Sequence, residues 1–306
     1  MNARSTSFTN GTANAAAAFA AVLFGASVVA VRIAVRDVPP LTLALFRFAQ
    51  GAMLLFVGLF LFRRDLLRVE RRDILYLALL GLVFYTVFPI TFNAGLLYIE
   101  ASRAALLLAT MPLWTVVLAR SVARERLTLR QLCGVLISVS GVAIVMFHRG
   151  AGAATSWRGD FLIIATAICG AVYNVLAKRV LTRYAGITVT FYAMLFGSLL
   201  LLPALFVERH VDLGSLSAES LAMVIFLGVF GGALAFSLWT SALRRLSPTQ
   251  VAVYINLNPM AATLLAATML KERLSGWFVL GFVAVAAGVM IVNWPGRAPV
   301  PTRAPV

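Results

Sequence analysis

Ten stretches of the chain are long, continuously apolar and nearly free of charge. A hydrocarbon layer about 30 Å thick is crossed by roughly 20 apolar residues of helix, whereas membrane strands are shorter and alternate apolar with polar residues. With 61% of its 306 residues apolar and only 12% charged, the composition is that of a lipid-embedded protein. We therefore predict an all-α integral membrane protein of ten transmembrane helices. They cover Asn14 to Val31, Leu41 to Phe62, Ile74 to Phe92, Ser102 to Ala119, Gln131 to Phe147, Phe161 to Ala177, Ile187 to Val207, Leu221 to Leu243, Thr249 to Leu270 and Trp277 to Trp294.

The two halves of the chain carry one repeated pattern. When residues 92–147 are laid on 239–294 without a gap, 13 of the 56 pairs are identical. Among the matches are Pro112 with Pro259, Glu125-Arg126-Leu127 with Glu272-Arg273-Leu274, Gly134 with Gly281, Gly141 with Gly288 and, further upstream, Gly25-Ala26 with Gly170-Ala171. The repeat is thus about five helices long, and an odd number makes the second copy enter the membrane from the opposite face. We predict two inverted five-helix repeats, over residues 14–147 and 159–294, followed by a disordered cytoplasmic tail over 295–306.

Positive charge is shared unevenly between the two ends of the predicted bundle. With a cytoplasmic N-terminus, 17 Lys and Arg residues fall on the cytoplasmic side and 8 on the other. This bias predicts a multi-pass protein of a bacterial inner (plasma) membrane with both termini in the cytoplasm. A cleaved signal peptide at the first stretch is the alternative, but only Arg4 precedes it and nine more spans follow. The net charge of +15 does not indicate nucleic-acid binding, because no basic stripe or aromatic-basic module lies outside the helices.

Several short motifs make the sequence similar to the EamA-type, ten-helix members of the drug/metabolite transporter superfamily. They are Pro40-Leu41-Thr42 with Arg47-Phe48, Ala109-Thr110-Met111-Pro112-Leu113-Trp114, Glu125-Arg126-Leu127 with Gly134 and Gly141, Asn258-Pro259, and Lys271-Glu272-Arg273-Leu274 with Gly281 and Gly288. The resemblance spans Asn14 to Trp294 and implies export or exchange of small metabolites, including amino acids, without an ATPase subunit. The sequence agrees on that last point, because it contains no phosphate-binding loop. We expect no cofactor and no enzymatic activity.

Groups that could couple transport to protons are scarce in the predicted spans. All acidic residues, and both histidines, fall in connections or at predicted helix ends. Glu100 is the nearest candidate for a coupling group, although we expect Arg103 to neutralise it as an ordinary helix-end charge. Arg47 is the one charged residue well inside a span. It either contacts a substrate carboxylate or is pinned to backbone carbonyls, and the resemblance favours the structural role.

Proline combined with polar or aromatic side chains selects the helices that could line a substrate cavity, because interior proline frees backbone carbonyls. We expect the third, fourth, eighth and ninth helices to line it, with contributions from the first and sixth. The candidate substrate-binding residues are Tyr85, Phe88, Phe92, Asn93, Thr110, Trp114, Tyr173, Asn174, Trp239, Tyr254, Asn256 and Asn258. Helix packing is the alternative role for each. We assign packing, and not substrate contact, to Gly134, Ser138, Gly141, Gly281 and Gly288.

Other functions remain as alternatives to amino-acid export. An exporter of amphipathic drugs or cations would use the same fold, while a carrier of phosphorylated sugars would need paired cations at mid-depth, for which only Arg47 and Lys178 are present. An intramembrane enzyme would need a catalytic or metal set, and Cys133 and Cys169 indicate neither a zinc site nor a disulfide framework. The expected partners are a small-molecule substrate and the lipid bilayer. Pairing into a homodimer is not decided by the sequence.

Overall fold

The computed structural model of the protein describes residues 3–99, 101–122, 125, 127–148, 156–208, 216–270 and 276–294. Across these ranges the chain is helical and forms no strand, which confirms the predicted all-α membrane fold. The first half contains α1 (Ala3–Ala34), α2 (Pro40–Phe62), η1 (Arg64–Leu67), α3 (Arg71–Leu80), η2 (Gly81–Val87), α4 (Phe88–Leu96), α5 (Ala101–Leu108), α6 (Met111–Ser121) and α7 (Leu129–His148). The second half contains α8 (Trp157–Leu181), α9 (Gly186–Leu201), α10 (Ala204–Val207), α11 (Ala218–Phe226), η4 (Leu227–Leu234), α12 (Ala235–Arg245), α13 (Pro248–Ala252), η5 (Val253–Asn256), α14 (Leu257–Leu270) and α15 (Gly276–Asn293).

Eight helical segments of the described chain are long and apolar enough to cross a membrane. A further helix, α7, has a shorter apolar part, Leu129–Val145. The predicted span from Thr249 to Leu270 divides into α13, η5 and α14, so the count of ten spans stays a prediction. Large apolar side chains cover the outer faces: Met53 and Phe206, for example, are 69% and 85% exposed. An outer surface of this kind is favourable in contact with lipid, whereas exposing it to water would be unfavourable.

Prolines coincide with breaks in three predicted spans. Pro112 is the second residue of α6, which follows a turn at Ala109 and Thr110, and Pro89 opens α4 directly after η2. Pro203 separates α9 from α10, but Gly186–Val207 as a whole is long and apolar enough to cross a membrane, in agreement with the predicted span Ile187 to Val207. The physical reason is common to all three, because proline lacks an N–H donor and its ring clashes with the carbonyl four residues earlier.

Each half contains a π-helical segment at the equivalent position. The segment η2 begins at Gly81, and a shift of 147 residues places Gly81 on Gly228 in η4. Such segments are rare and occur frequently at functional sites. The two segments differ in side chains, because Phe84-Tyr85 in η2 corresponds to Gly231-Gly232 in η4. The two segments η2 and η4 therefore have the same type of backbone structure but different side chains.

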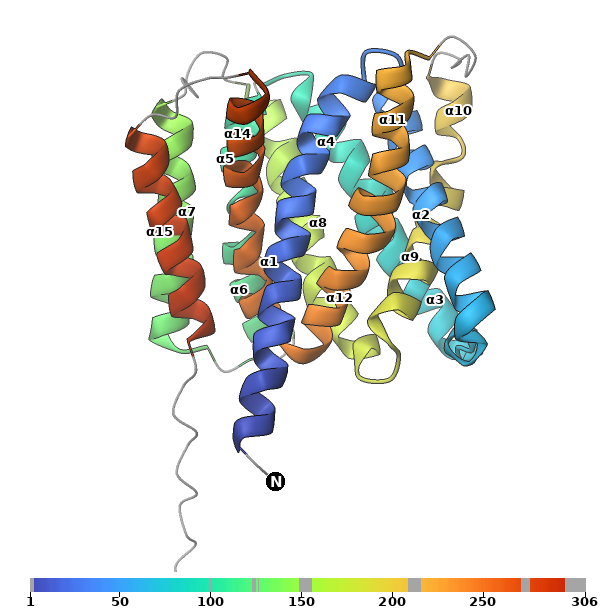
Figure 1. The fold of residues 1–306 in the computed structure, drawn as a ribbon, viewed down its shortest axis with the longest axis horizontal. Helices are drawn as coiled ribbons and strands as arrows, with labels where there is room; N and C mark the ends of the chain where they lie inside the picture. The colour runs from blue at the N-terminus through green and yellow to red at the C-terminus, as the bar shows by residue number, and fades with distance from the viewer. Residues whose placement is uncertain are drawn as a thin grey trace, which may run out of the picture.

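The two halves run in opposite directions and pack across each other. α1 begins, and α15 ends, at the lower end of the bundle in Figure 1. The C-terminal end of α8, the equivalent of α1, lies at that same end, because Lys178 contacts the end of α12 and Arg245 of α12 contacts Thr12 in α1. η2 packs on α9 of the other half, where Gly81 meets Gly197, and η4 packs correspondingly on α2. The interface between the halves thus runs through the middle of the bundle.

Glycines allow the closest helix contact, between α7 and α15, which run side by side at one edge of the bundle (Figure 1). A Cβ on Gly141 would lie 2.6 Å from Gly281 O, and a Cβ on Gly134 would lie 2.9 Å from Gly288 O. Each glycine therefore meets the non-equivalent glycine of the other repeat, because Gly134 corresponds in sequence to Gly281 and Gly141 to Gly288. The predicted packing role of these four glycines is confirmed.

Charged side chains satisfy helix ends that the backbone cannot. Glu208, which follows α10, accepts hydrogen bonds from Leu41 N (3.0 Å) and Thr42 N (2.7 Å) in the first turn of α2. Lys178 donates to Leu243 O and Leu246 O, each at 2.7 Å, at the end of α12. An anion at a helix start and a cation at a helix end both oppose the helix dipole. Glu208 also joins the two halves, because α2 and α10 belong to different repeats.

Candidate functional site

Aromatic side chains from both halves gather inside the bundle. We call the set of Phe24 (α1), Phe48 (α2), Phe84 and Tyr85 (η2), Phe88 (α4), Tyr173 (α8), Phe236 and Trp239 (α12) the central aromatic cluster. The ring of Phe84 stacks on Tyr173 with 4.5 Å between centroids, and Phe24 lies 4.7 Å from Phe236. Tyr85 meets Phe236 edge-on at 5.1 Å. The cluster therefore bridges the interface between the repeats.

Polar atoms within this cluster lack hydrogen-bond partners. The side chains of Tyr85 and Tyr173 are fully buried, and neither hydroxyl group has a hydrogen-bond partner outside this pair. The two rings lie 5.9 Å apart and perpendicular, near enough for their hydroxyl groups to interact electrostatically. Asn174 is satisfied, because its Oδ1 accepts from Trp239 Nε1 at 2.9 Å. Because an unsatisfied buried polar group costs about 1–3 kcal/mol, these two hydroxyl groups make the cluster the candidate site.

Arg47 lies beside the cluster and holds η4 through one of its nitrogens. Its Nη2 donates to Gly231 O at 2.7 Å, which is the expected structural contact with a backbone carbonyl. Its Cζ lies 5.6 Å from the ring centroids of both Phe48 and Phe236, within range of a cation–π interaction. The glycine pair of η4 leaves room for it, since a Cβ on Gly231 would lie 3.3 Å from Arg47 Nη2. Its Nε is buried without a partner.

The structure brings together only part of the predicted site. Tyr85, Phe88, Tyr173, Asn174 and Trp239 meet in or beside the central aromatic cluster, and Phe92 extends it by stacking on Phe88 at 6.3 Å. Four members of the cluster were not among the predicted residues: Phe24, Phe48, Phe84 and Phe236. Exposed phenylalanines lie on the same spans as three of these residues, namely Phe19 in α1, Phe56 in α2 and Phe230 before α12, so the residue type alone did not mark them.

The remaining predicted residues lie apart from the cluster or make local contacts. Trp114 Nε1 donates to Thr110 Oγ1 at 3.2 Å, one turn earlier in the chain. Asn256 Nδ2 donates to Ser138 Oγ at 3.0 Å, toward α7. Tyr254 is buried, whereas Asn93 and Asn258 are half-buried. Substrate contact by these residues stays a prediction.

The acidic side chains that the structure describes lie at helix ends or between helices. The proposed coupling group Glu100 lies outside the described residues. The expected neutralisation of Glu100 by Arg103 therefore stays a prediction, while Arg103 pairs with Asp160 of α8 through two hydrogen bonds of 2.7 Å. In the described part of the chain, no group of three or more His, Cys, Asp or Glu residues is arranged to hold a metal ion.

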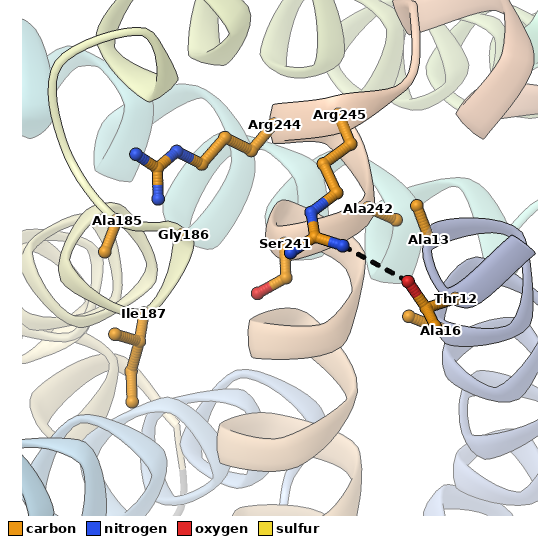
Figure 2. Close-up of a pocket in the computed structure, with 10 residues that line it drawn as sticks. All are labelled: Thr12, Ala13, Ala16, Ala185, Gly186, Ile187, Ser241, Ala242, Arg244 and Arg245. Carbon is orange, nitrogen blue, oxygen red and sulfur yellow. Dashed lines mark hydrogen bonds between the residues drawn. The ribbon is translucent and has the colours of Figure 1, made fainter. Parts of the chain in front are cut away.

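A pocket of about 400 Å³ opens at the end of the bundle where α1 begins. Figure 2 shows its walls, formed by the starts of α1 and α9 and the end of α12. Arg245 reaches across to Thr12, with 3.1 Å between Nη1 and Oγ1, while Arg244 extends toward Gly186. Ala242 in its wall is one helical turn from Trp239, whose ring meets Phe24 at 5.8 Å. The pocket and the central aromatic cluster therefore lie along the same pair of helices, α1 and α12.

The inverted halves, the apolar outer surface and the shared central cluster define a multi-pass membrane protein with the two-repeat architecture of many secondary transporters. The model of the EamA-like transporter family matches residues 12–147 and 157–294. The chain belongs to this family, as its sequence motifs predicted.

Known proteins are similar over most of the chain. A probable terminal-alkyne amino-acid exporter of Streptantibioticus cattleyicolor is 30% identical over 226 residues, which is 74% of this chain and 75% of that protein. An uncharacterized transporter of Archaeoglobus fulgidus is 26% identical and covers 89% of this chain and 94% of its own. A solved structure with 19% identity superposes with a TM-score of 0.79 over 92% of this chain and 96% of its own, which shows the shared fold.

Proposed function

We propose that the chain is a secondary transporter that exports or exchanges small metabolites, amino acids first among them, by alternating access between its two halves. The observation that carries the proposal is the central aromatic cluster, which both repeats build and in which two tyrosine hydroxyl groups are buried without hydrogen-bond partners outside their pair. Inverted repeats with a site at their interface are the common architecture of alternating access. The similarity to an amino-acid exporter supports the class of cargo.

The charge beside the cluster favours amino acids over amphipathic cations. Arg47 places a positive charge near Phe48 and Phe236, and no acidic side chain among the described residues pairs with it. A cationic drug would be repelled there, whereas a zwitterion offers a carboxylate. A phosphate ester fits less well, because Lys178, the second candidate cation, already donates to the carbonyls of Leu243, Arg244 and Leu246.

The interior of the described bundle favours exchange or facilitated export over a proton relay. A relay needs a carboxyl or imidazole group that can titrate within the membrane. The described acidic groups, such as Asp73 and Asp160, are instead at helix ends and paired with Arg183 and Arg103. We therefore propose that the solute gradient, and not a proton gradient, drives the movement.

The proposed location is a bacterial inner membrane with both termini in the cytoplasm. The excess of Lys and Arg on the side of the N-terminus supports this orientation. In that orientation the pocket at Thr12 and Arg245 faces the cytoplasm. Fusions of a cytoplasm-only and a periplasm-only reporter to the C-terminus test it, and activity of the periplasmic reporter alone would contradict the orientation.

A flux assay tests the function directly. Purified protein is reconstituted into vesicles loaded with each of the twenty amino acids, and efflux is followed with and without the same amino acid outside. We expect saturable efflux of at least one amino acid that external substrate accelerates, and no change when a proton ionophore is added. A folded protein without saturable flux of any amino acid would contradict the proposed cargo. Strict dependence on a proton gradient would contradict the mechanism.

A further inference from the structure

Arg47 is a partly buried cation whose Nε is fully buried and which has an incomplete set of partners. One Nη donates to Gly231 O, Nε is buried and unpaired, and aromatic rings lie at 5.6 Å on two sides. Nothing acidic among the described side chains approaches it. Taking a charge out of water is expensive unless an opposite charge or several hydrogen bonds replace the hydration. The carbonyl of Gly231 supplies one hydrogen bond and no negative charge, so the site favours an anionic ligand.

Two hydroxyl donors lie within the same cluster. Tyr85 is in ring contact with Phe48, with 5.0 Å between centroids, and Phe48 also flanks the guanidinium group of Arg47. Arg47 and Tyr85 are close enough to act on each other electrostatically. Tyr173 follows at 5.9 Å from Tyr85. Apart from each other, the two hydroxyl groups have no hydrogen-bond partner, and a phenol can donate one hydrogen bond to an anion.

The three groups come from different helices of both repeats. Arg47 is in α2 and Tyr85 in η2, both in the first half, whereas Tyr173 is in α8 of the second half. A ligand bound to all three would join the repeats at their interface. Phe84 and Phe236 surround the donors with apolar surface, which suits the uncharged part of a small organic solute.

We propose that Arg47, Tyr85 and Tyr173 form a carboxylate-binding subsite, in which the guanidinium Nε and the two hydroxyl groups donate to the carboxylate of the transported solute. This inference rests on the proposed transport function and names the part of the cargo that is recognised. A single guanidinium with two neutral donors matches the charge and the acceptor number of one carboxylate. Arg47 would then donate one hydrogen bond to Gly231 O in η4 and another to the bound carboxylate.

Matched ligands separate the carboxylate from the rest of the solute. L-leucine, L-phenylalanine and L-methionine are compared with their primary amides, which lack the carboxylate, and with their N-acetyl derivatives, which keep it. Binding is read as thermal stabilisation of the purified full-length protein, and transport as efflux from vesicles. We expect the acids and the N-acetyl acids to bind at least tenfold more tightly than the amides.

Matched variants assign the effect to these residues. Arg47→Gln should remove most of the preference for acid over amide, Arg47→Lys should keep part of it, and Tyr85→Phe and Tyr173→Phe should each weaken acid binding roughly two- to tenfold. Tyr192→Phe is the control, because its hydroxyl donates to Leu67 O away from the cluster at 2.7 Å. If Arg47→Gln does not fold, the double variant Tyr85→Phe, Tyr173→Phe is tested in its place. It lacks both hydroxyl groups but keeps both aromatic rings, so the packing of the cluster is preserved.

The outcomes separate the two proposals. Equal response of the wild type to acids and amides, with transport intact, would overturn the subsite and leave the transport function standing. An unchanged preference in Arg47→Gln, or in the double tyrosine variant, would overturn the assignment to these residues. Absence of both binding and efflux for every ligand would contradict amino-acid transport itself, and the subsite with it.

Discussion

Replacing Gly141 by alanine should push apart the two helices that pack most closely. A Cβ there would lie 2.6 Å from Gly281 O and 2.8 Å from Val285 N, both backbone atoms of α15 that cannot rotate away. Ordinary van der Waals contact begins at 3.4 Å, so α7 and α15 must separate by about 0.8 Å or accept the overlap. Overpacking of this kind typically destabilises a protein by about 1–3 kcal/mol.

The higher helix propensity of alanine partly offsets the destabilisation caused by the clash. A control variant is needed to subtract this contribution. Alanine is favoured over glycine inside a helix by about 1 kcal/mol whatever it touches. Gly58 in α2 supplies the matched control, because a Cβ there meets nothing within 4 Å. Gly58→Ala should therefore be neutral or slightly stabilising. The difference in unfolding free energy between the two variants reports the clash alone, and we expect about 1–3 kcal/mol.

Reversible unfolding in mixed micelles measures this difference, with thermal midpoints in detergent as a second readout. Gly281→Ala should behave like Gly141→Ala, because its Cβ would lie 2.6 Å from Gly141 O. If Gly141→Ala and Gly281→Ala are as stable as Gly58→Ala, the close approach of α7 and α15 is wrong.

Three further substitutions test contacts that hold the site in place. Lys178→Met removes the donor to three carbonyls at the end of α12 and should lower the free energy of unfolding by about 1–3 kcal/mol; a thermal midpoint equal to that of the wild type would contradict this role. Glu208→Ala removes the cap of α2 and should destabilise by about 1–2 kcal/mol, measured in the same way, whereas Glu208→Gln should lose less. Trp239→Phe and Asn174→Ala remove the two ends of one buried hydrogen bond; a double-mutant cycle should give a coupling of about 1 kcal/mol, and simple additivity would show that the bond contributes nothing.

The membrane fold and the glycine contacts could be predicted from sequence for a physical reason. Apolar length and charge bias follow directly from residue type, and a glycine repeated at the same register, such as Gly134 and Gly281, has a steric meaning wherever it occurs. The breaks inside the spans were harder. Pro89 and Pro112 mark them, but η4 contains no proline that would mark its departure from α-helical geometry.

The candidate site was predicted only in part, because a sequence does not show which face of a membrane helix turns inward. Phe236 is buried in the cluster, whereas Phe230, on the same helical segment, is 44% exposed. Both are phenylalanines in an apolar run, so only the packing of the other helices distinguishes them. Tyr85 was found because its span contains an interior proline, Pro89, and Tyr173 because the polar Asn174 follows it.

The unequal side chains of η2 and η4 bear on the resting state of the carrier. If the two repeats were identical, a two-fold rotation about an axis in the membrane plane would convert the inward-open form into the outward-open form. The two forms would then have the same free energy, and an empty carrier would populate both equally. Phe84-Tyr85 in one repeat and Gly231-Gly232 in the other remove that equality. A bias of 1.4 kcal/mol already makes one form about tenfold more populated than the other. The empty site would then be open to one side of the membrane most of the time. Solute on the other side could bind only to the less populated form.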